Sequence, residues 1–191
     1  MVNFKESQTK ENLMKAFAGE SQARNRYTFA AEIAKKQGLY VIEAVFKFTA
    51  NQELAHANVF MKHLSELTGE NLEICGTYPV EVTNSVIELL ENAEHNESEE
   101  FKNVYKSFAE TAEREGNMAV AGSFKDIAKI ENTHSERFKL FAELLKTNKL
   151  FVSDVECNGC ALTAAIFIKV KKCRKFVQFA VTKKDILSAW N

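Results

Sequence analysis

The chain has 191 residues, of which 46% are hydrophobic and 27% charged, and its formal net charge is −1. This much apolar surface can build a packed core, which argues against global disorder, and the near-zero charge gives no support for electrostatic binding of nucleic acid. Only seven glycines and one proline are present, well below the average usage of about 7% and 5%. Sandwich, barrel and Rossmann folds need more turns than this, so the composition predicts an all-α chain of long helices.

Helical periodicity predicts four helices, near residues 8–36, 40–67, 84–114 and 118–147. Their joints are marked by Gly38, the segment from Gly69 to Pro79, and Gly116. Thr9 is a candidate cap for the first helix. The first and last pairs have short links, whereas the middle link is long enough to carry the chain across a bundle end. We therefore expect two hairpins joined by a crossover, a four-helix bundle over residues 1–150, and a short irregular tail over 151–191.

Each predicted helix carries an inward stripe at alternating spacings of three and four residues. The third stripe runs through Val86, Leu90, Ala93, Glu97, Glu100, Val104 and Phe108. All four stripes are apolar except near their middle, where carboxylates and imidazoles take core positions. These polar core residues are Glu20, Glu53, His56, Glu97, Glu100, Glu131 and His134.

Five glutamates and two histidines cannot share a bundle core as an unpaired cluster, because burying one unpartnered carboxylate costs several kcal/mol. Either these groups shift their pKa values and become neutral, or cations of high charge lie among them. Mixed oxygen and imidazole ligands suit iron or manganese, whereas structural zinc favours thiolates. Glu53-x-x-His56 and Glu131-x-x-His134 each place both side chains on one helical face. A Glu-x-x-His pair on each of two helices and a Glu from each of the others is typical of ferritin-like di-iron bundles.

Three alternatives remain open on the residues alone. A single Glu-x-x-His is a weak signal, because most such pairs are surface neighbours. Glu94 lies one turn before Glu97 and competes with it for a ligand role. Tyr27 and Tyr105 can each hydrogen-bond a ligand carboxylate or be ordinary core tyrosines.

Three segments carry a resemblance to a known family: AFAGESQARNRY at 16–27, NQELAH at 51–56 and ENTHSERF at 131–138. The chain resembles rubrerythrins over roughly residues 5–156. The resemblance implies a ferritin-like di-iron domain followed by a rubredoxin-like Fe(Cys)₄ domain, in a cytoplasmic homodimer that reduces hydrogen peroxide in oxidative-stress protection. No nucleic acid partner is expected, because the net charge is close to zero. No membrane partner is expected either, since the start of the chain lacks a signal-peptide core and no run is long enough to span a membrane.

The resemblance also implies roles for the core residues. The ligands of two iron ions would be Glu20, Glu53, His56, Glu97, Glu100, Glu131 and His134. The family has a tyrosine five residues after the third-helix Glu-x-x-Glu, so Tyr105 favours Glu97 and Glu100 over Glu94, and favours Tyr27 and Tyr105 as partners of ligand carboxylates. One iron would exchange a glutamate of the third helix for His56 as its oxidation state changes. Electrons would come through the rubredoxin-like iron, from rubredoxin or an NAD(P)H-linked reductase.

The tail departs from the family. A rubredoxin-like site needs four thiolates, but residues 151–191 contain only Cys157, Cys160 and Cys173, so no intact Cys₄ site or third iron can be assigned. Reading the codons of residues 158–191 in a shifted frame permits a C-x₂-C-x₁₂-C-x₂-C pattern, with no stop codon forced. We therefore interpret the tail as a frameshift starting near Asn158, which resequencing the gene through that codon would test.

Two other functions compete with peroxide reduction. One is a ferroxidase or iron-handling ferritin relative that uses oxygen, and the other is a metal-free helical interaction protein. An iron content of about two per bundle would exclude the metal-free interaction protein. The relative rates of reaction with peroxide and with oxygen would separate a peroxidase from a ferroxidase.

Overall fold

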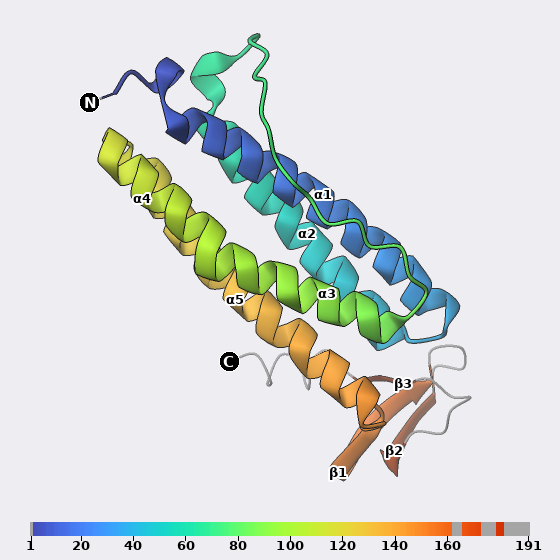
Figure 1. Ribbon diagram of the computed structural model, residues 1–191. Coiled ribbons are helices and arrows are strands. Elements are labelled where there is room, and N and C mark those ends of the chain that lie inside the picture. The colour runs from blue at the N-terminus through green and yellow to red at the C-terminus, as the bar shows by residue number, and fades with distance from the viewer. Residues whose placement is uncertain (1, 162–165, 173–178, 182–191) are drawn as a thin grey trace.

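The computed structural model describes residues 2–161, 166–172 and 179–181, with backbone alone from residue 153 onward (Figure 1). Its helices are α1 (Gln8–Lys36), α2 (Tyr40–His63), α3 (Val86–Glu99), α4 (Tyr105–Glu115) and α5 (Met118–Lys146). Short 3₁₀ turns cover Phe4–Glu6 and Ser65–Leu67, and a π-helix covers Glu100–Val104 between α3 and α4. Within the described residues, no helix is both long and apolar enough to cross a lipid bilayer.

Two antiparallel hairpins form the bundle, α1 with α2, and α3–α4 with α5 (Figure 1). Gly38 at a φ of 72° and Gly116 at a φ of 88° provide the left-handed turns of the two tight links. The predicted four-helix bundle of two hairpins with a crossover is confirmed. The predicted cap is corrected: Ser7 caps α1 by accepting the Lys10 N–H at 3.1 Å. Thr9 is buried inside α1, where it donates to Glu115 from the next hairpin.

The crossover does not pass over a bundle end, as the sequence interpretation assumed, but runs along the bundle beside α1 (Figure 1). Because α2 and α3–α4 run in the same direction, the chain must return the length of α2 before the second hairpin begins. With 24 residues, α2 is about 36 Å long. The segment 68–85 can span up to about 60 Å when extended, so it covers this distance with length to spare.

The π-helix changes the register of the third predicted stripe. Its wider turn is closed by a bond from the Tyr105 N–H to the Glu100 carbonyl, five residues earlier. Beyond it the buried positions are Tyr105, Ala109 and Ala112, whereas Val104 and Phe108 are only partly buried. The predicted stripe is therefore one residue out of register after Glu100, because regular 3.6-residue periodicity takes no account of the extra residue in a π-turn.

Two apolar clusters fill the bundle core on either side of a polar layer. Around one end, Tyr27, Phe46 and Phe138 pack with ring centroids 5.1 to 6.0 Å apart. Toward the other end, Phe60 and Phe124 pack at 5.1 Å within a cluster that includes Tyr105. Burying each such aromatic side chain contributes about 1.5–3 kcal/mol, so the apolar clusters hold the helices together around the polar layer.

After α5 the chain forms three strands, β1 (Val152–Ala161), β2 (Ile166–Lys172) and β3 (Phe179–Val181), in an antiparallel sheet of order β2-β1-β3. Over these residues the tail forms regular strands, so the prediction of an irregular tail is wrong there. The reason is visible in the sequence: the IFIKVKK segment of β2 is rich in β-branched and aromatic residues, which favour strands.

Gly122 in α5 offers a test of how the helices are packed. A Cβ added there would meet no atom within 4 Å, so alanine should bring its higher helix propensity without a clash. We expect Gly122→Ala to stabilise the protein by about 0.5–1 kcal/mol and to raise the melting temperature by about 2–4 °C, measured by circular dichroism. Gly116→Ala is the control: its φ of 88° makes alanine destabilising. Equal shifts for the two variants would contradict this prediction.

Candidate metal centre

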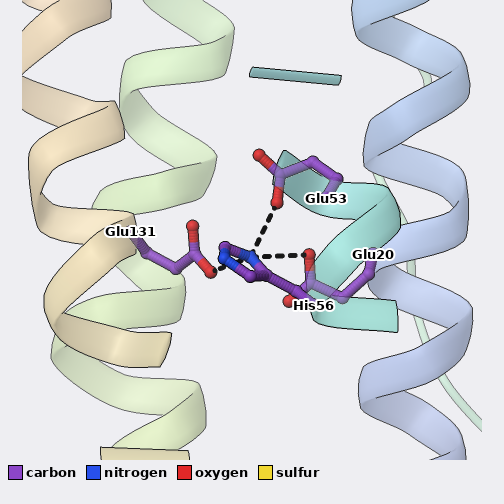
Figure 2. A group of neighbouring side chains, drawn as sticks. All are labelled: Glu20, Glu53, His56 and Glu131. Atoms are coloured by element: carbon purple, nitrogen blue, oxygen red, sulfur yellow. Dashed lines mark hydrogen bonds and ion pairs between the residues drawn. The ribbon is translucent and has the colours of Figure 1, made fainter. Parts of the chain in front are cut away.

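The polar layer contains two groups of side chains that can each hold a cation. The first consists of Glu20 from α1, Glu53 and His56 from α2, and Glu131 from α5 (Figure 2). His56 Nδ1 lies 2.9 Å from Glu131 Oε1, 3.1 Å from Glu53 Oε2 and 3.7 Å from Glu20 Oε2. One imidazole nitrogen is thus surrounded by three carboxylates from three helices.

The second group repeats this geometry at the neighbouring position in the same polar layer. It consists of Glu53, Glu97, Glu131 and His134, with Glu97 supplied by α3. His134 Nδ1 lies 2.8 Å from Glu131 Oε2, 3.1 Å from Glu53 Oε1 and 3.3 Å from Glu97 Oε2. The two imidazole rings are nearly parallel, with centroids 5.7 Å apart.

Glu53 and Glu131 belong to both groups, and each directs one carboxylate oxygen to each histidine. Glu20 with His56, and Glu97 with His134, belong to one group each. Two carboxylates that each direct one oxygen to one centre and the other oxygen to its neighbour have the arrangement of ligands shared by two metal ions. The chain therefore provides two adjacent cation positions joined by shared glutamates.

Two tyrosines hold the unshared glutamates in place. The Tyr27 hydroxyl donates to Glu97 Oε1, and the Tyr105 hydroxyl donates to Glu20 Oε1. Both tyrosines are only 2% exposed, and one belongs to each apolar cluster. Each hydroxyl fixes one carboxylate oxygen and leaves the other directed into the site, so the two sequence alternatives for these tyrosines are both realised: core packing and a bond to a candidate ligand.

The charges in the layer shift the pKa values of its members. Burial raises the pKa of Glu20 to about 8. Burial alone would lower the pKa of both imidazoles, but the neighbouring carboxylates raise the pKa of His56 to about 10 and that of His134 to about 11. Burial also favours protonation of Glu53, yet the two histidines outweigh it and lower its pKa to about 2. Protonated imidazoles therefore stand in for cations between the carboxylates.

The residues fit a metal pair on this structure's own geometry. Several buried carboxylate oxygens and ring nitrogens of the layer make no hydrogen bond of regular geometry within the described part of the chain: Glu20 Oε2, Glu53 Oε1, Glu97 Oε2, both Glu131 oxygens, and both His134 ring nitrogens. Apart from His134 Nε2, the contacts of these atoms given above are ion pairs between a carboxylate and an imidazole, and buried polar atoms that lack hydrogen bonds are costly. Two divalent cations would satisfy them and would balance the charge of four carboxylates.

Six of the seven predicted ligands are thus brought together. Glu100 is not part of either group of four, but lines a cavity beside them. Glu100 lies where α3 ends and the π-helix begins, and burial together with the nearby Glu97, Glu20 and Glu53 raises its pKa. The rival Glu94 is partly buried and belongs to neither group.

One charged residue near the site was not predicted from the sequence. Arg137 lies one turn after His134 in α5 and is only 6% exposed. Its Nη1 lies 3.0 Å from both Thr49 Oγ1 and Gln52 Oε1, and its guanidinium stands 5.0 Å over the Phe48 ring. Its place in the ENTHSERF segment, three residues after a candidate ligand, was the available signal that it faces inward.

The tail cysteines contribute no described side chain. The backbone of Cys157 and Cys160 lies in β1, while their side chains and the whole of Cys173 are outside the described residues. The interpretation of this region as a shifted reading frame also falls there and stays a prediction.

A four-helix bundle that buries shared glutamates between two Glu-x-x-His pairs belongs to the ferritin-like class of metal-binding proteins. Within that class the chain belongs to the rubrerythrin family, whose family model matches residues 11–142. Rubrerythrin-1 of Clostridium acetobutylicum is 46% identical over 156 residues, which cover 81% of this chain and 80% of that protein. The family and the buried glutamate–histidine groups together support a di-iron site.

Solved structures agree with this assignment. A mixed-valence nigerythrin superposes with a TM-score of 0.65 at 25% identity, covering 94% of this chain and 90% of nigerythrin. A bacterioferritin from Desulfovibrio desulfuricans, solved with its diiron site in different catalytic states, gives a TM-score of 0.67 over 75% of this chain and 82% of its own. At 22% identity the second likeness shows the fold alone. The predicted ferritin-like bundle and the predicted family are confirmed.

Proposed function

We propose that this protein is a non-haem di-iron peroxidase that reduces hydrogen peroxide to two molecules of water and so protects the cell against oxidative stress. The observation that carries the proposal is the pair of adjacent cation positions that share Glu53 and Glu131. Membership of the rubrerythrin family supports the same assignment. A two-electron substrate needs two one-electron donors held side by side, which is what the shared glutamates provide.

When bound at these two positions, a ferrous pair would supply the two electrons that reduction of the O–O bond consumes. Glu53 and Glu131 hold the two positions at a fixed separation, while Glu20 with His56 and Glu97 with His134 complete one position each. Tyr27 and Tyr105 keep the unshared carboxylates from rotating away. The two apolar clusters exclude bulk water on either side of the layer.

Protons must accompany the electrons, because reduction of one peroxide to two waters consumes two of each. Glu100 is placed to provide one, since it lines the cavity beside the site. Burial and the neighbouring Glu97, Glu20 and Glu53 raise its pKa well above the ordinary value. A raised pKa favours the protonated carboxyl, which can donate to a departing oxygen and be reprotonated from the cavity. The family's exchange of this residue with His56 is part of the same proposal.

The electrons would return from outside the bundle. We infer a rubredoxin or an NAD(P)H-linked reductase as donor, a cytoplasmic location and a homodimer, in line with the family. Residues 151–191 supply three cysteines rather than four, so an internal Fe(Cys)₄ relay has no complete ligand set in this sequence. We therefore propose a di-iron bundle over residues 1–150 and a separate tail. Because the tail lacks a complete iron relay, the bundle needs an external electron donor.

The test is a comparison of oxidants under single-turnover conditions. Protein loaded anaerobically with ferrous iron is mixed with hydrogen peroxide or with oxygen, and oxidation is followed by stopped-flow absorbance. We expect about two irons per chain and much faster oxidation by peroxide. Faster oxidation by oxygen would favour a ferroxidase, and a chain that binds no iron would favour a helical interaction protein.

A further inference from the structure

A cavity of about 270 Å³ lies directly beside the metal-binding layer. Its walls come from α1, from the crossover at residues 76–79 and from the α3–α4 helix. It is smaller than the roughly 300–1,000 Å³ of pockets for drug-sized ligands, so its size suits a molecule of a few heavy atoms.

The inner wall of the cavity connects it to the candidate ligands. Tyr105 lines it and donates its hydroxyl to Glu20, and Glu100 lines it as well. Arg26 also lines it, and its buried Nε has no hydrogen-bond acceptor within the described residues. The nearest carboxylate oxygen to that nitrogen, Glu81 Oε2, is 3.8 Å away. The inner wall thus carries an arginine and a glutamate next to the candidate ligands, a polar lining that suits a small hydroperoxide.

The outer wall is formed by Tyr78 of the crossover. Its ring lies over Gly19, the residue before Glu20: a Cβ added to Gly19 would lie 3.9 Å from Tyr78 Cε1. A Cβ added to Gly76 would lie 3.1 Å from the Tyr78 hydroxyl and 3.3 Å from its ring. Only glycine at 76 leaves this ring position free of crowding.

Glu81 fastens this part of the crossover to the bundle. Glu81 Oε1 accepts a hydrogen bond of 2.6 Å from Asn96 Nδ2 of α3, and Glu81 Oε2 is paired with Arg26 of α1. The carboxylate is largely buried, with 10% of its side chain exposed. Glu81 thus attaches the crossover to both α1 and α3. This attachment, three residues after Tyr78, helps to hold the Tyr78 ring at the outer wall of the cavity.

We propose that this cavity is the entry site for the peroxide substrate and that Tyr78 sets its size limit, admitting hydrogen peroxide and small alkyl hydroperoxides and excluding bulky ones. The inference rests on the proposed peroxidase function. Tyr78 acts by position alone: its ring occupies space that a larger substrate needs. The groups behind it, Arg26 and Glu100, orient the small substrate that passes.

The test compares Tyr78→Ala with the wild type, both loaded with iron. We expect the ratio of turnover with cumene hydroperoxide to turnover with hydrogen peroxide to rise by at least about tenfold, the scale on which pocket shape discriminates substrates. Independently of turnover, the association rate of azide, measured by stopped-flow absorbance, should rise in the same variant. Iron content should stay unchanged, since Tyr78 belongs to neither metal-binding group.

Three further variants keep the result interpretable. Tyr78→Phe retains the ring and loses only the 3.4 Å hydrogen bond from its hydroxyl to the Lys15 carbonyl, so both readouts should stay much closer to the wild type than in Tyr78→Ala. Gly76→Ala should push the ring aside by only a few tenths of an ångström, so it should shift both readouts in the same direction as Tyr78→Ala but by less. Val80→Ala is the matched control, because Val80 lies in the same segment with 89% of its surface exposed. Unchanged azide rates and unchanged selectivity in Tyr78→Ala would overturn the inference. A wild type that binds azide but does not reduce peroxide would instead overturn the proposed function, while the azide rates still test the cavity.

Discussion

Replacing Glu53 with alanine is expected to abolish binding of both metal ions rather than one. Glu53 gives one carboxylate oxygen to each of the two positions, at 3.1 Å from His56 Nδ1 and 3.1 Å from His134 Nδ1. Its loss removes a ligand from both at once. We expect metal affinity to fall by more than the roughly 10- to 100-fold typical of residues that only support a ligand. Iron content after anaerobic reconstitution, determined by atomic emission, measures this directly.

Glu94→Ala and Glu97→Ala are a matched pair of variants for this test. Both residues lie in α3, but Glu97 is 1% exposed and belongs to the His134 group, whereas Glu94 belongs to neither group. Glu97→Ala should lower iron occupancy through the His134 position, and Glu94→Ala should leave occupancy unchanged. Full iron content in Glu53→Ala would show that the glutamates are not shared ligands. Loss of iron in Glu94→Ala alone would show that α3 directs Glu94, and not Glu97, toward the metal positions.

Much of the bundle was predictable because its signals are local and repeated. Apolar residues at spacings of three and four specify a buried helical face, and Gly38 and Gly116 mark turns that need positive φ. The same periodicity could not show the π-helix, because one extra residue in a turn leaves no compositional trace. Tyr105 is therefore buried at a position that regular spacing assigns to Val104.

The candidate ligands were predictable for a related reason. Charged residues at core positions are rare unless they are paired, so Glu20, Glu53 and Glu131 stood out against otherwise apolar stripes. The side chains around them were harder to find. Tyr78 and Glu81 lie in a crossover without periodicity, and only the folded chain brings them against Gly19 and Arg26. Sharing of Glu53 and Glu131 between two positions likewise depends on how helices from both hairpins face one another.

Metal binding is expected to release protons and to become tighter as pH rises. In the metal-free protein the pKa of His56 is about 10 and that of His134 about 11, so both imidazoles are protonated at neutral pH. Each must lose its proton before it can coordinate a metal. Every proton released makes affinity rise by about tenfold per pH unit, so one imidazole per position predicts about tenfold per unit for each ion and about a hundredfold for the pair. Glu20, whose pKa is about 8, adds a further proton at the His56 position near neutrality. Calorimetric titration with ferrous iron in buffers of different ionisation enthalpy counts these protons.

The stability of the metal-free bundle should change in the opposite direction. The folded pKa of His134, about 11, lies above the ordinary 6.5, so its contribution is complete below pH 6.5 and is lost as pH rises toward 11. Glu20 has the same sign, because its pKa is raised from 4.5 to about 8 and folding favours its neutral form. Glu53, lowered to about 2, is stabilising above pH 4.5 and loses that contribution only in acid. The difference in melting temperature between iron-loaded and metal-free protein should therefore widen from pH 6.5 to pH 9.

The Glu94→Ala variant should show the same pH dependence as the wild type, because its side chain takes no part in either group. His134→Ala should lose one of the released protons together with most of the affinity of its position, which separates the two imidazole contributions. An affinity for ferrous iron that does not vary with pH, with no protons released on binding, would contradict the assignment of His56 and His134 as ligands. Proton release in His134→Ala equal to that of the wild type would assign the protons to the carboxyl groups instead.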